Sequence, residues 1–364
     1  MTFRELSATC GRNTSSDRDL RRRSAGFARL SGVLVSGLLS CVLTGVSGNV
    51  WARDAARDPV PTEPSIVEVQ QALAAGRFDV RTLEHHYETR INTLDRAGPK
   101  LNSVIELNPD AAKVAGALDT GTHKGQPLYG VPVLLKDNID TGDGMQTTAG
   151  SLALVGSKTP RDAFIVGRLR EAGALILGKT NLSEWANFRS PHSSSGWSGR
   201  GGQTRNPYAL NRTPCGSSSG SGAAIAADLA VVAVGTETDG SIVCPSSANG
   251  LVGIKPTVGL VSRSGIIPIS ASQDTAGPMA RSVADAAALL TVIAGYDPGD
   301  PATEPLKSRA PLDYKQFLNR DGLKGVRIGV MRQQAGFHDE VDALFNKAID
   351  TLRAQGAVIV DLSK

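Results

Sequence analysis

The apolar run "LAVVAV" at 229–234 places the strongest limit on the fold, because it ends directly in the polar segment "GTETDGS" (235–241). A short apolar run bounded by turn residues is typical of a buried strand. The Ser/Gly-rich segment "CGSSSGSG" (215–222) comes before the run and leads into an Ala-rich helix. The chain therefore predicts a loop, a helix and a buried strand in succession, with serines at both ends of this unit.

Helical and extended patterns alternate along the rest of the chain. A capping box, Ser65-x-x-Glu68, begins the first predicted helix. The alternation predicts an α/β fold, in which a mixed, mostly parallel sheet core is covered by helices on both faces. The last predicted strand (357–362) begins close to the end of the sequence, so we expect a domain that is incomplete at its C-terminus. The other predicted helices cover 80–97, the first part of 163–181, 282–295 and 338–355, and the other predicted strands cover 129–140, the end of 163–181 and 325–331.

The first 52 residues have the pattern of a secretory signal peptide. Four arginines precede the apolar stretch "LSGVLVSGLLSCVLTGVSG" (30–48), and "VWA" offers a cleavage site after Ala52. We expect an exported protein, periplasmic or secreted, with a linker at 53–64, one domain at 65–364 and no membrane span after processing. A membrane anchor is disfavoured by the many Gly and Ser residues, and a lipid anchor at Cys41 is the weaker alternative.

The basic character of the chain belongs to this leader. Residues 1–52 contain seven arginines and three acidic residues, against 39 basic and 35 acidic residues in the whole chain. Subtraction leaves 32 of each in the remainder, which therefore has no formal net charge. This balance gives no electrostatic basis for binding nucleic acid, and we predict no nucleic-acid partner.

Cysteine and histidine usage does not predict a metal site. Only Cys215 and Cys244 follow the leader, and the sequence leaves open whether they form a disulfide or are two small buried residues. The five histidines have no ligand spacing and no evident catalytic partner, so a base for a serine has to come from elsewhere. They are His85, His86, His123, His192 and His338.

Lys136, at the end of the apolar segment "VPVLL" (131–135), is the candidate base. Its pKa has to fall from a reference value of ~10.4 by about 3 units, which requires burial or a neighbouring positive charge. The candidate nucleophile is Ser241, since the small residues before it allow backbone N–H groups to point into one space, as an oxyanion hole requires. Taken alone, these residues only suggest a Ser/Lys hydrolase.

Three other interpretations of the Ser/Gly-rich segment remain open at this point. A flexible linker is disfavoured because the segment runs into a helix and a core strand. A phosphate-binding loop lacks the G-x-x-x-x-G-K-[ST] motif. "GSSSG" (216–220) matches the nucleophile elbow of α/β-hydrolases with Ser218 at its centre, but the preceding "NPYALNRTPC" does not resemble the strand that this motif needs.

Residues 213–287, from "TPCGSSSGSG" to "ARSVADAA", resemble the signature segment of the amidase signature family. The resemblance extends over nearly all of the chain after the leader. It implies the family's α/β fold, amide hydrolysis through an acyl-enzyme and no cofactor. The segments "TETDGSIVCP" and "SQDTAGPMARS" are most similar to the peptide amidases, which remove the C-terminal amide of peptides.

The resemblance implies a Ser-cisSer-Lys triad. In it Ser241 is the nucleophile, Ser217 follows a cis peptide bond and relays a proton, and Lys136 is the base. Ser218 is then a supporting hydrogen-bond donor. The implied oxyanion hole consists of the backbone N–H groups of Thr238, Asp239, Gly240 and Ser241.

The implied substrate is a small-molecule or peptide amide. Val243 stands where the common family pattern has arginine, which disfavours small dicarboxylate-like substrates. Other hydrolases of the family, acting on fatty acid, aryl or indoleacetamide amides, are the alternative. The tRNA-dependent amidotransferase of the family is disfavoured for an exported protein, and an inactive, truncated binding protein is the non-enzymatic alternative.

Overall fold

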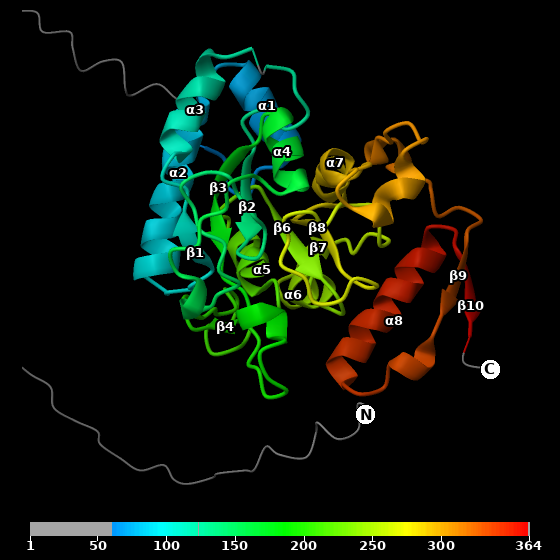
Figure 1. The fold of residues 1–364 in the computed structure, drawn as a ribbon. Helices are drawn as coiled ribbons and strands as arrows, with labels where there is room; N and C mark the ends of the chain where they lie inside the picture. The colour runs from blue at the N-terminus through cyan, green and yellow to red at the C-terminus, as the bar shows by residue number, and fades with distance from the viewer. Residues whose placement is uncertain (1–59, 123, 363–364) are drawn as a thin grey trace, which may run out of the picture. The chain divides into compact units, whose positions relative to one another are not determined.

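The computed structural model describes residues 60–122 and 124–362 (Figure 1). The predicted signal peptide at 1–52 and most of the predicted linker lie outside the described residues. The α-helices are α1 (Ile66–Ala74), α2 (Val80–Arg90), α3 (Ala111–Thr120), α4 (Phe164–Glu171), α5 (Ser219–Ala226), α6 (Val243–Ala248), α7 (Val283–Ile293) and α8 (Asp339–Ala354). The strands are β1 (Val104–Leu107), β2 (Pro132–Lys136), β3 (Leu175–Thr180), β4 (Trp197–Ser198), β5 (Gly202–Gln203), β6 (Val232–Glu237), β7 (Val252–Gly253), β8 (Thr275–Ala280), β9 (Arg327–Val330) and β10 (Val358–Asp361).

The main sheet has six strands in the order β1-β3-β2-β6-β8-β7. The three central strands, β3, β2 and β6, are parallel to one another, whereas β1, β8 and β7 each pair antiparallel with a neighbour. Four of the six strands consequently point the same way. This is the mixed, mostly parallel sheet that the alternating sequence pattern predicts.

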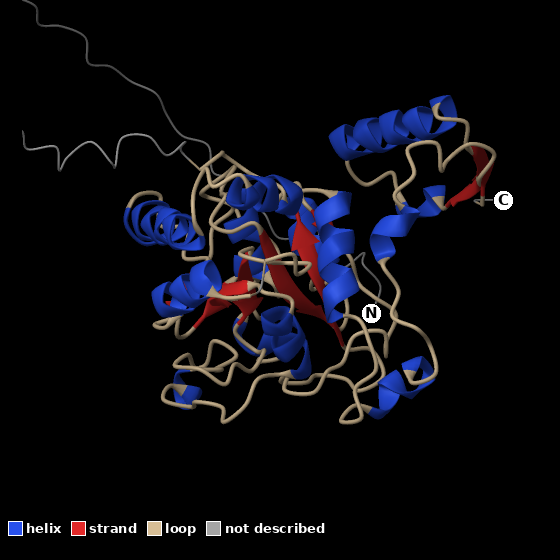
Figure 2. Ribbon diagram, turned by 90° about the horizontal axis from the view of Figure 1, so that it is seen from above, coloured by secondary structure: helices blue, strands red, loops and turns tan. Residues whose placement is uncertain are grey.

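Helices cover both faces of this sheet (Figure 2). α5 packs against five of the strands, and α7 packs against β6, β7 and β8 as well as α4. The approach of α5 to β6 depends on Gly235, because a Cβ atom there would lie only 2.7 Å from Ser218 Oγ. The end of β6 and the start of α5 are therefore held in direct contact.

The sheet brings the ends of β2 and β6 together. Leu135 of β2 is in register with Val234 of β6, and Val133, Leu134 and Leu135 are fully buried. β6 does not end at Val234, as the apolar run predicts, but continues through Glu237. The reason is its pairing with β8, which extends to the partners Glu237 and Thr275.

The C-terminal part contains β9, α8 and β10. β9 and β10 pair in parallel with each other and form a separate two-stranded sheet, and α8 connects them. The predicted helix at 338–355 and the predicted strands at 325–331 and 357–362 are all present. Among the described residues, no helix is long and apolar enough to cross a membrane.

Candidate active site

Lys136 lies at the end of β2 and is fully buried. Its Nζ donates hydrogen bonds to Ser217 Oγ at 2.7 Å, to Thr236 Oγ1 at 2.8 Å and to the Thr236 carbonyl at 3.1 Å. Burial lowers the pKa of Lys136 to about 7, against the opposing effect of the Glu237 and Asp274 carboxylates. The amine is therefore suited to act as a base near neutral pH.

Ser217 lies two residues before the start of α5 and is fully buried. The Gly216–Ser217 peptide bond is cis. Gly216 has no space for a side chain, because a Cβ atom would lie 2.4 Å from Ser183 Oγ and 2.7 Å from Ser219 Oγ. The structure therefore brings the predicted base and the predicted relay serine into direct hydrogen-bond contact.

Ser218 joins the start of α5 to the end of β6. Its Oγ donates to the Thr236 carbonyl at 3.1 Å and accepts from the Thr236 N–H at 3.2 Å. Its own N–H donates to the Ser241 carbonyl at 3.1 Å. Both bonds of the hydroxyl are used within the fold, which matches a supporting role and disfavours Ser218 as the central serine of a nucleophile elbow.

Ser241 lies in the turn between β6 and α6, and 7% of its surface is exposed. Gly240, just before it, has a φ of +78°, in the left-handed region that glycine enters without strain. In the part of the chain that the structure describes, no hydrogen bond joins Ser241 Oγ to Ser217 Oγ. The structure thus pairs Lys136 with Ser217 and leaves the Ser241 hydroxyl without a bond to either of them.

Glu237, the last residue of β6, shapes this turn. Its buried carboxylate accepts the N–H of Gly240 at 2.9 Å on one oxygen, and those of Ile242 at 2.6 Å and Val243 at 2.9 Å on the other. A carboxylate that accepts several N–H groups at the start of a helix is a strong cap. Glu237 was not predicted from the sequence, although an acidic residue four positions before the serine was a usable signal.

This arrangement bears on the predicted oxyanion hole, which includes the Gly240 N–H. Because the Gly240 N–H already donates to Glu237, it is not free to bind an oxyanion in this structure. The N–H groups of Thr238, Asp239 and Ser241 have no acceptor among the described residues. These three N–H groups are therefore the ones without a protein acceptor, and the oxyanion hole itself stays a prediction.

Asp274 connects the serine turn to the neighbouring loop. It accepts the Thr238 hydroxyl at 2.5 Å and the N–H groups of Ile269 and Ser270 at 2.8 Å each. Lys255 Nζ donates to the Thr238 carbonyl at 2.7 Å. The turn that carries Ser241 is thus tied to the loop around 266–271.

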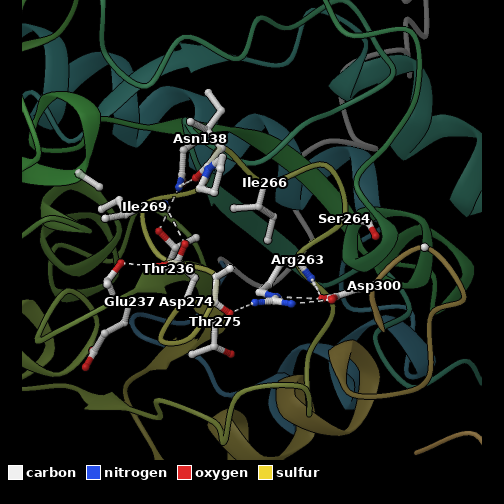
Figure 3. A pocket seen from close by; sticks show the side chains of 16 residues that line it. Asn138, Thr236, Glu237, Arg263, Ser264, Ile266, Ile269, Asp274, Thr275 and Asp300 are labelled. Carbon is white, nitrogen blue, oxygen red and sulfur yellow. Dashed lines mark hydrogen bonds and ion pairs between the residues drawn. The ribbon is translucent and has the colours of Figure 1, made fainter. Parts of the chain in front are cut away.

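A cavity of about 260 Å³ lies beside the turn (Figure 3). Its polar side includes Asn138, whose Nδ2 donates to Thr236 Oγ1 at 3.1 Å, and the paired side chains of Arg263 and Asp300. The pairing with Arg263 lowers the pKa of Asp300 to about 2. The apolar wall consists of Ile266, Ile267, Pro268 and Ile269.

A second cavity of about 110 Å³ continues along the same apolar wall. It shares Asn138, Ala186 and residues 267–269 with the first cavity, and adds the aromatic side chains of Trp185 and Phe188. Trp185, Ala186 and the next residue, Asn187, all have φ between +51° and +70°, a conformation that non-glycine residues rarely adopt. We refer to these two adjoining cavities together as the groove; Thr238 of the serine turn lines one of them and this aromatic segment lines the other.

A second buried lysine, Lys179 on β3, also lies near the site. Its Nζ donates to the carbonyls of Ile139 at 2.7 Å and Gln146 at 3.0 Å, and to Thr147 Oγ1 at 3.1 Å. Burial lowers its pKa, while Asp137 and other nearby carboxylates raise it. Lys179 thus stabilises the segment between Ile139 and Thr147, which follows Lys136. Lys179 was not predicted from the sequence.

Cys215 and Cys244, whose pairing the sequence leaves open, form a disulfide in the structure. The described residues contain no group of three or more histidine, cysteine or acidic side chains placed to hold a metal ion.

A family model described as Amidase matches residues 87–364. A probable amidase of Arabidopsis thaliana is 47% identical over 305 residues, which cover 82% of this chain and 58% of that protein. A glutamyl-tRNA(Gln) amidotransferase chain of Acinetobacter baumannii is 41% identical over 304 residues, with 82% and 59% covered. The chain therefore spans somewhat more than half the length of these relatives.

The crystal structure of the native peptide amidase from Stenotrophomonas maltophilia matches with a TM-score of 0.79 and 57% sequence identity. The match covers 82% of this chain and 62% of that one. Together with the family model, which covers well over half of the sequence, this likeness confirms the predicted fold and family. The chain belongs to the amidase signature family.

Proposed function

We propose that this protein hydrolyses carboxamide bonds and that its substrates are the C-terminal amides of peptides, from which it releases ammonia. The observation that carries the proposal is the 2.7 Å hydrogen bond between the buried Lys136 Nζ and Ser217 Oγ. A lysine with a pKa of about 7 supplies the base that the chain's histidines do not.

In its neutral form Lys136 has two N–H donors and one lone pair, so in the first half of the reaction it keeps its bonds to Thr236 and accepts a hydrogen bond from the Ser217 hydroxyl. Lys136 then takes the proton of Ser217, and Ser217 Oγ takes the proton of Ser241. Ser241 Oγ then attacks the amide carbonyl carbon. The developing oxyanion binds the N–H groups of Thr238, Asp239 and Ser241. Catalytic hydrogen bonds that are open in the free enzyme often close when substrate binds, and this relay requires that the Ser241 hydroxyl then contacts Ser217 Oγ.

In the second half, the C–N bond breaks and the proton held by Lys136 passes back through Ser217 to the leaving nitrogen, which departs as ammonia. The acyl group remains as an ester on Ser241 Oγ. A water molecule, deprotonated through the same relay, attacks this ester. The carboxylic acid leaves, and Ser241 regains its proton.

The groove supports a peptide as the substrate. Its wall of isoleucine and proline side chains, continued by Trp185 and Phe188, offers an apolar surface for side chains next to the scissile amide. The charge of Arg263 is already matched by Asp300, so it is not a free partner for a substrate carboxylate. The 57% identity to a peptide amidase supports the same substrate class.

Export is part of this proposal. The disulfide between Cys215 and Cys244 suits an oxidising compartment, in agreement with the leader pattern at 1–52. Fractionation of cells that express the full chain should recover it from the exported fraction, with a mature N-terminus at Arg53. Recovery of the uncleaved chain from the cytoplasm would contradict this part of the proposal.

The direct test is ammonia release from an N-acetylated dipeptide amide with apolar side chains, incubated with the purified full chain. We expect turnover by the wild type and by Ser247→Ala, which alters an exposed serine on α6, but none by Ser241→Ala. Fatty acid, aryl and indoleacetamide amides, tested in parallel, measure the competing substrate classes. Equal ammonia release by Ser241→Ala would refute the nucleophile.

A further inference from the structure

The disulfide between Cys215 and Cys244 links the two segments that carry the serines. Cys215 lies two residues before Ser217, and Cys244 lies three residues after Ser241 in the first turn of α6. The two Cα atoms are 5.9 Å apart. The mechanism above uses neither sulfur, so the position of the bridge needs a separate explanation.

Two further sets of hydrogen bonds connect these two segments. One is the hydrogen bond from the Ser218 N–H to the Ser241 carbonyl, at 3.1 Å. The other involves the buried Asn249, whose Nδ2 donates to the Pro214 carbonyl at 3.0 Å and to the Pro245 carbonyl at 2.7 Å. The disulfide is the covalent member of this set.

The backbone of Cys215 is itself held in an uncommon conformation. Its φ is +61°, in the left-handed region that non-glycine residues rarely adopt. Such a conformation persists where the surroundings fix it. When the disulfide is reduced, Cys215 loses one of its restraints. Any change in its backbone conformation then occurs only two residues from Ser217.

The bridge is open to a reductant from the solvent. Cys244 is exposed and Cys215 is partly buried, whereas Ser217 and Ser241 are buried. We therefore expect a small dithiol to reach the sulfurs without entering the substrate groove, which neither cysteine lines. It breaks the S–S bond by giving two electrons and two protons, which yields two cysteine thiols and the oxidised, cyclic form of the dithiol.

We propose that this disulfide is a clamp that positions Ser217 against Ser241, so that turnover depends on the oxidised state of the bridge. This inference rests on the proposed amide hydrolysis. The clamp acts on the alignment of the relay, not on the substrate groove, which the sulfurs do not line. Reduction is consequently expected to lower kcat and to leave KM nearly unchanged.

The test measures kcat and KM for the dipeptide amide with the full chain before reduction, after dithiothreitol treatment and after reoxidation. Reduction should lower kcat by roughly tenfold or more, since small displacements of reacting groups have large effects on rate. KM should change less than twofold, and reoxidation should restore kcat. The double variant Cys215→Ser/Cys244→Ser should have the low kcat throughout and not respond to the reductant.

Cys10→Ser/Cys41→Ser is the matched control, because it removes the other two cysteines of the chain. This variant should respond to the reductant as the wild type does. A bridge that only stabilises the fold would lower the melting temperature on reduction and leave kcat at 25 °C unchanged. That result would overturn the proposal. If the double variant does not fold, comparing the oxidised and reduced wild type is enough to obtain this result.

Labelling of Ser241 by a sulfonyl fluoride, followed by mass spectrometry, separates the two proposals. Oxidised protein that is labelled but releases no ammonia has a different substrate. In that case, slower labelling after reduction would support the clamp. An equal labelling rate before and after reduction would overturn it. Oxidised protein that neither labels nor releases ammonia would refute both the proposed function and the clamp.

Discussion

Lys136 and Lys179 are both fully buried, on the neighbouring strands β2 and β3, yet they have different surroundings. Burial lowers the pKa of each. The register pairs Lys136 with Thr180 and Leu135 with Lys179, so the two lysine side chains point to opposite faces of the sheet. α5 packs on the face to which Lys136 points. Thr180, the register partner of Lys136, shares a hydrogen bond with Ser221 of this helix.

The hydrogen-bond partners of the two amines differ in the same way. Lys179 gives all three of its bonds to the segment between Ile139 and Thr147, and two of them go to backbone carbonyls. Lys136 gives one of its bonds to the hydroxyl of Ser217, which lies in the same loop as Ser218 and Cys215. Burial thus lowers the pKa of both lysines. Their hydrogen-bond partners distinguish Lys136, the candidate base, from Lys179, which has a structural role.

The substitution Lys136→Met should have the largest effect on activity. Methionine keeps the approximate volume but removes the amine, so kcat/KM should fall about 10³- to 10⁴-fold through loss of the base. Stability to urea should change little, because the Thr236 carbonyl and Thr236 Oγ1 keep their bonds from Ser218 Oγ and Asn138 Nδ2 while the cost of burying an amine disappears. Retention of more than a tenth of the activity would contradict the role of Lys136.

The relay serine should matter more than its neighbour. Ser217→Ala interrupts the path from Lys136 to Ser241 and should lower kcat by about 10²- to 10³-fold. Ser218→Ala loses two hydrogen bonds to Thr236 and should lower kcat by roughly tenfold or less. Parallel assays of the two variants test this order, and the reverse order would favour the nucleophile elbow with Ser218 at its centre.

Glu237→Gln should lower kcat by roughly ten- to a hundredfold. An amide cannot accept the three N–H bonds that the carboxylate accepts, so the serine turn loses part of its support. The charge of Glu237 also raises the pKa of Lys136, so its removal should move the rising limb of the pH profile to lower pH. A limb that stays in place or moves to higher pH would contradict this electrostatic role.

Lys179→Met should reduce stability more than activity. The substitution leaves the Gln146 carbonyl without its donor and the Ile139 carbonyl with only the longer bond from the Thr147 hydroxyl, at 3.4 Å. We expect a loss of about 2–3 kcal/mol in the free energy of unfolding. The kcat of the folded variant should stay within tenfold of wild type. Lys113→Met, at an exposed position on α3, is the control and should change neither quantity. A loss of kcat as large as that of Lys136→Met would remove the distinction between the two lysines.

The sequence predicts those parts of the fold that depend on local pattern. The capping box of Ser65 and Glu68 is present at the start of α1, and the Ala-rich helix and the buried strand appear as α5 and β6. β1 and β8 were not predicted, because "VIEL" is short and "TAGPMA" contains Gly and Pro, residues that are uncommon in strands. Their strand structure comes from pairing with β3 and β6.

The same distinction between local sequence pattern and long-range pairing applies to the candidate site. Lys136, Ser217 and Ser241 are visible in the sequence because the resemblance covers their motifs, and the structure pairs the first two. Glu237 was missed because the apolar run stops at Val234, whereas the true end of the strand depends on β8. The pairing of the two cysteines likewise depends on how α5 and α6 pack, which no local pattern encodes.

The central claim, that Lys136 is a neutral base, is tested most directly by the pH dependence of kcat/KM between pH 5 and 9.5. Lys136 is protonated below its pKa and cannot accept a proton there, so activity should be low at pH 5. It should rise to half of its maximum near pH 7 and remain high above that value. A rise centred near pH 10, the ordinary range of lysine, or a rate that does not change with pH, would contradict the account.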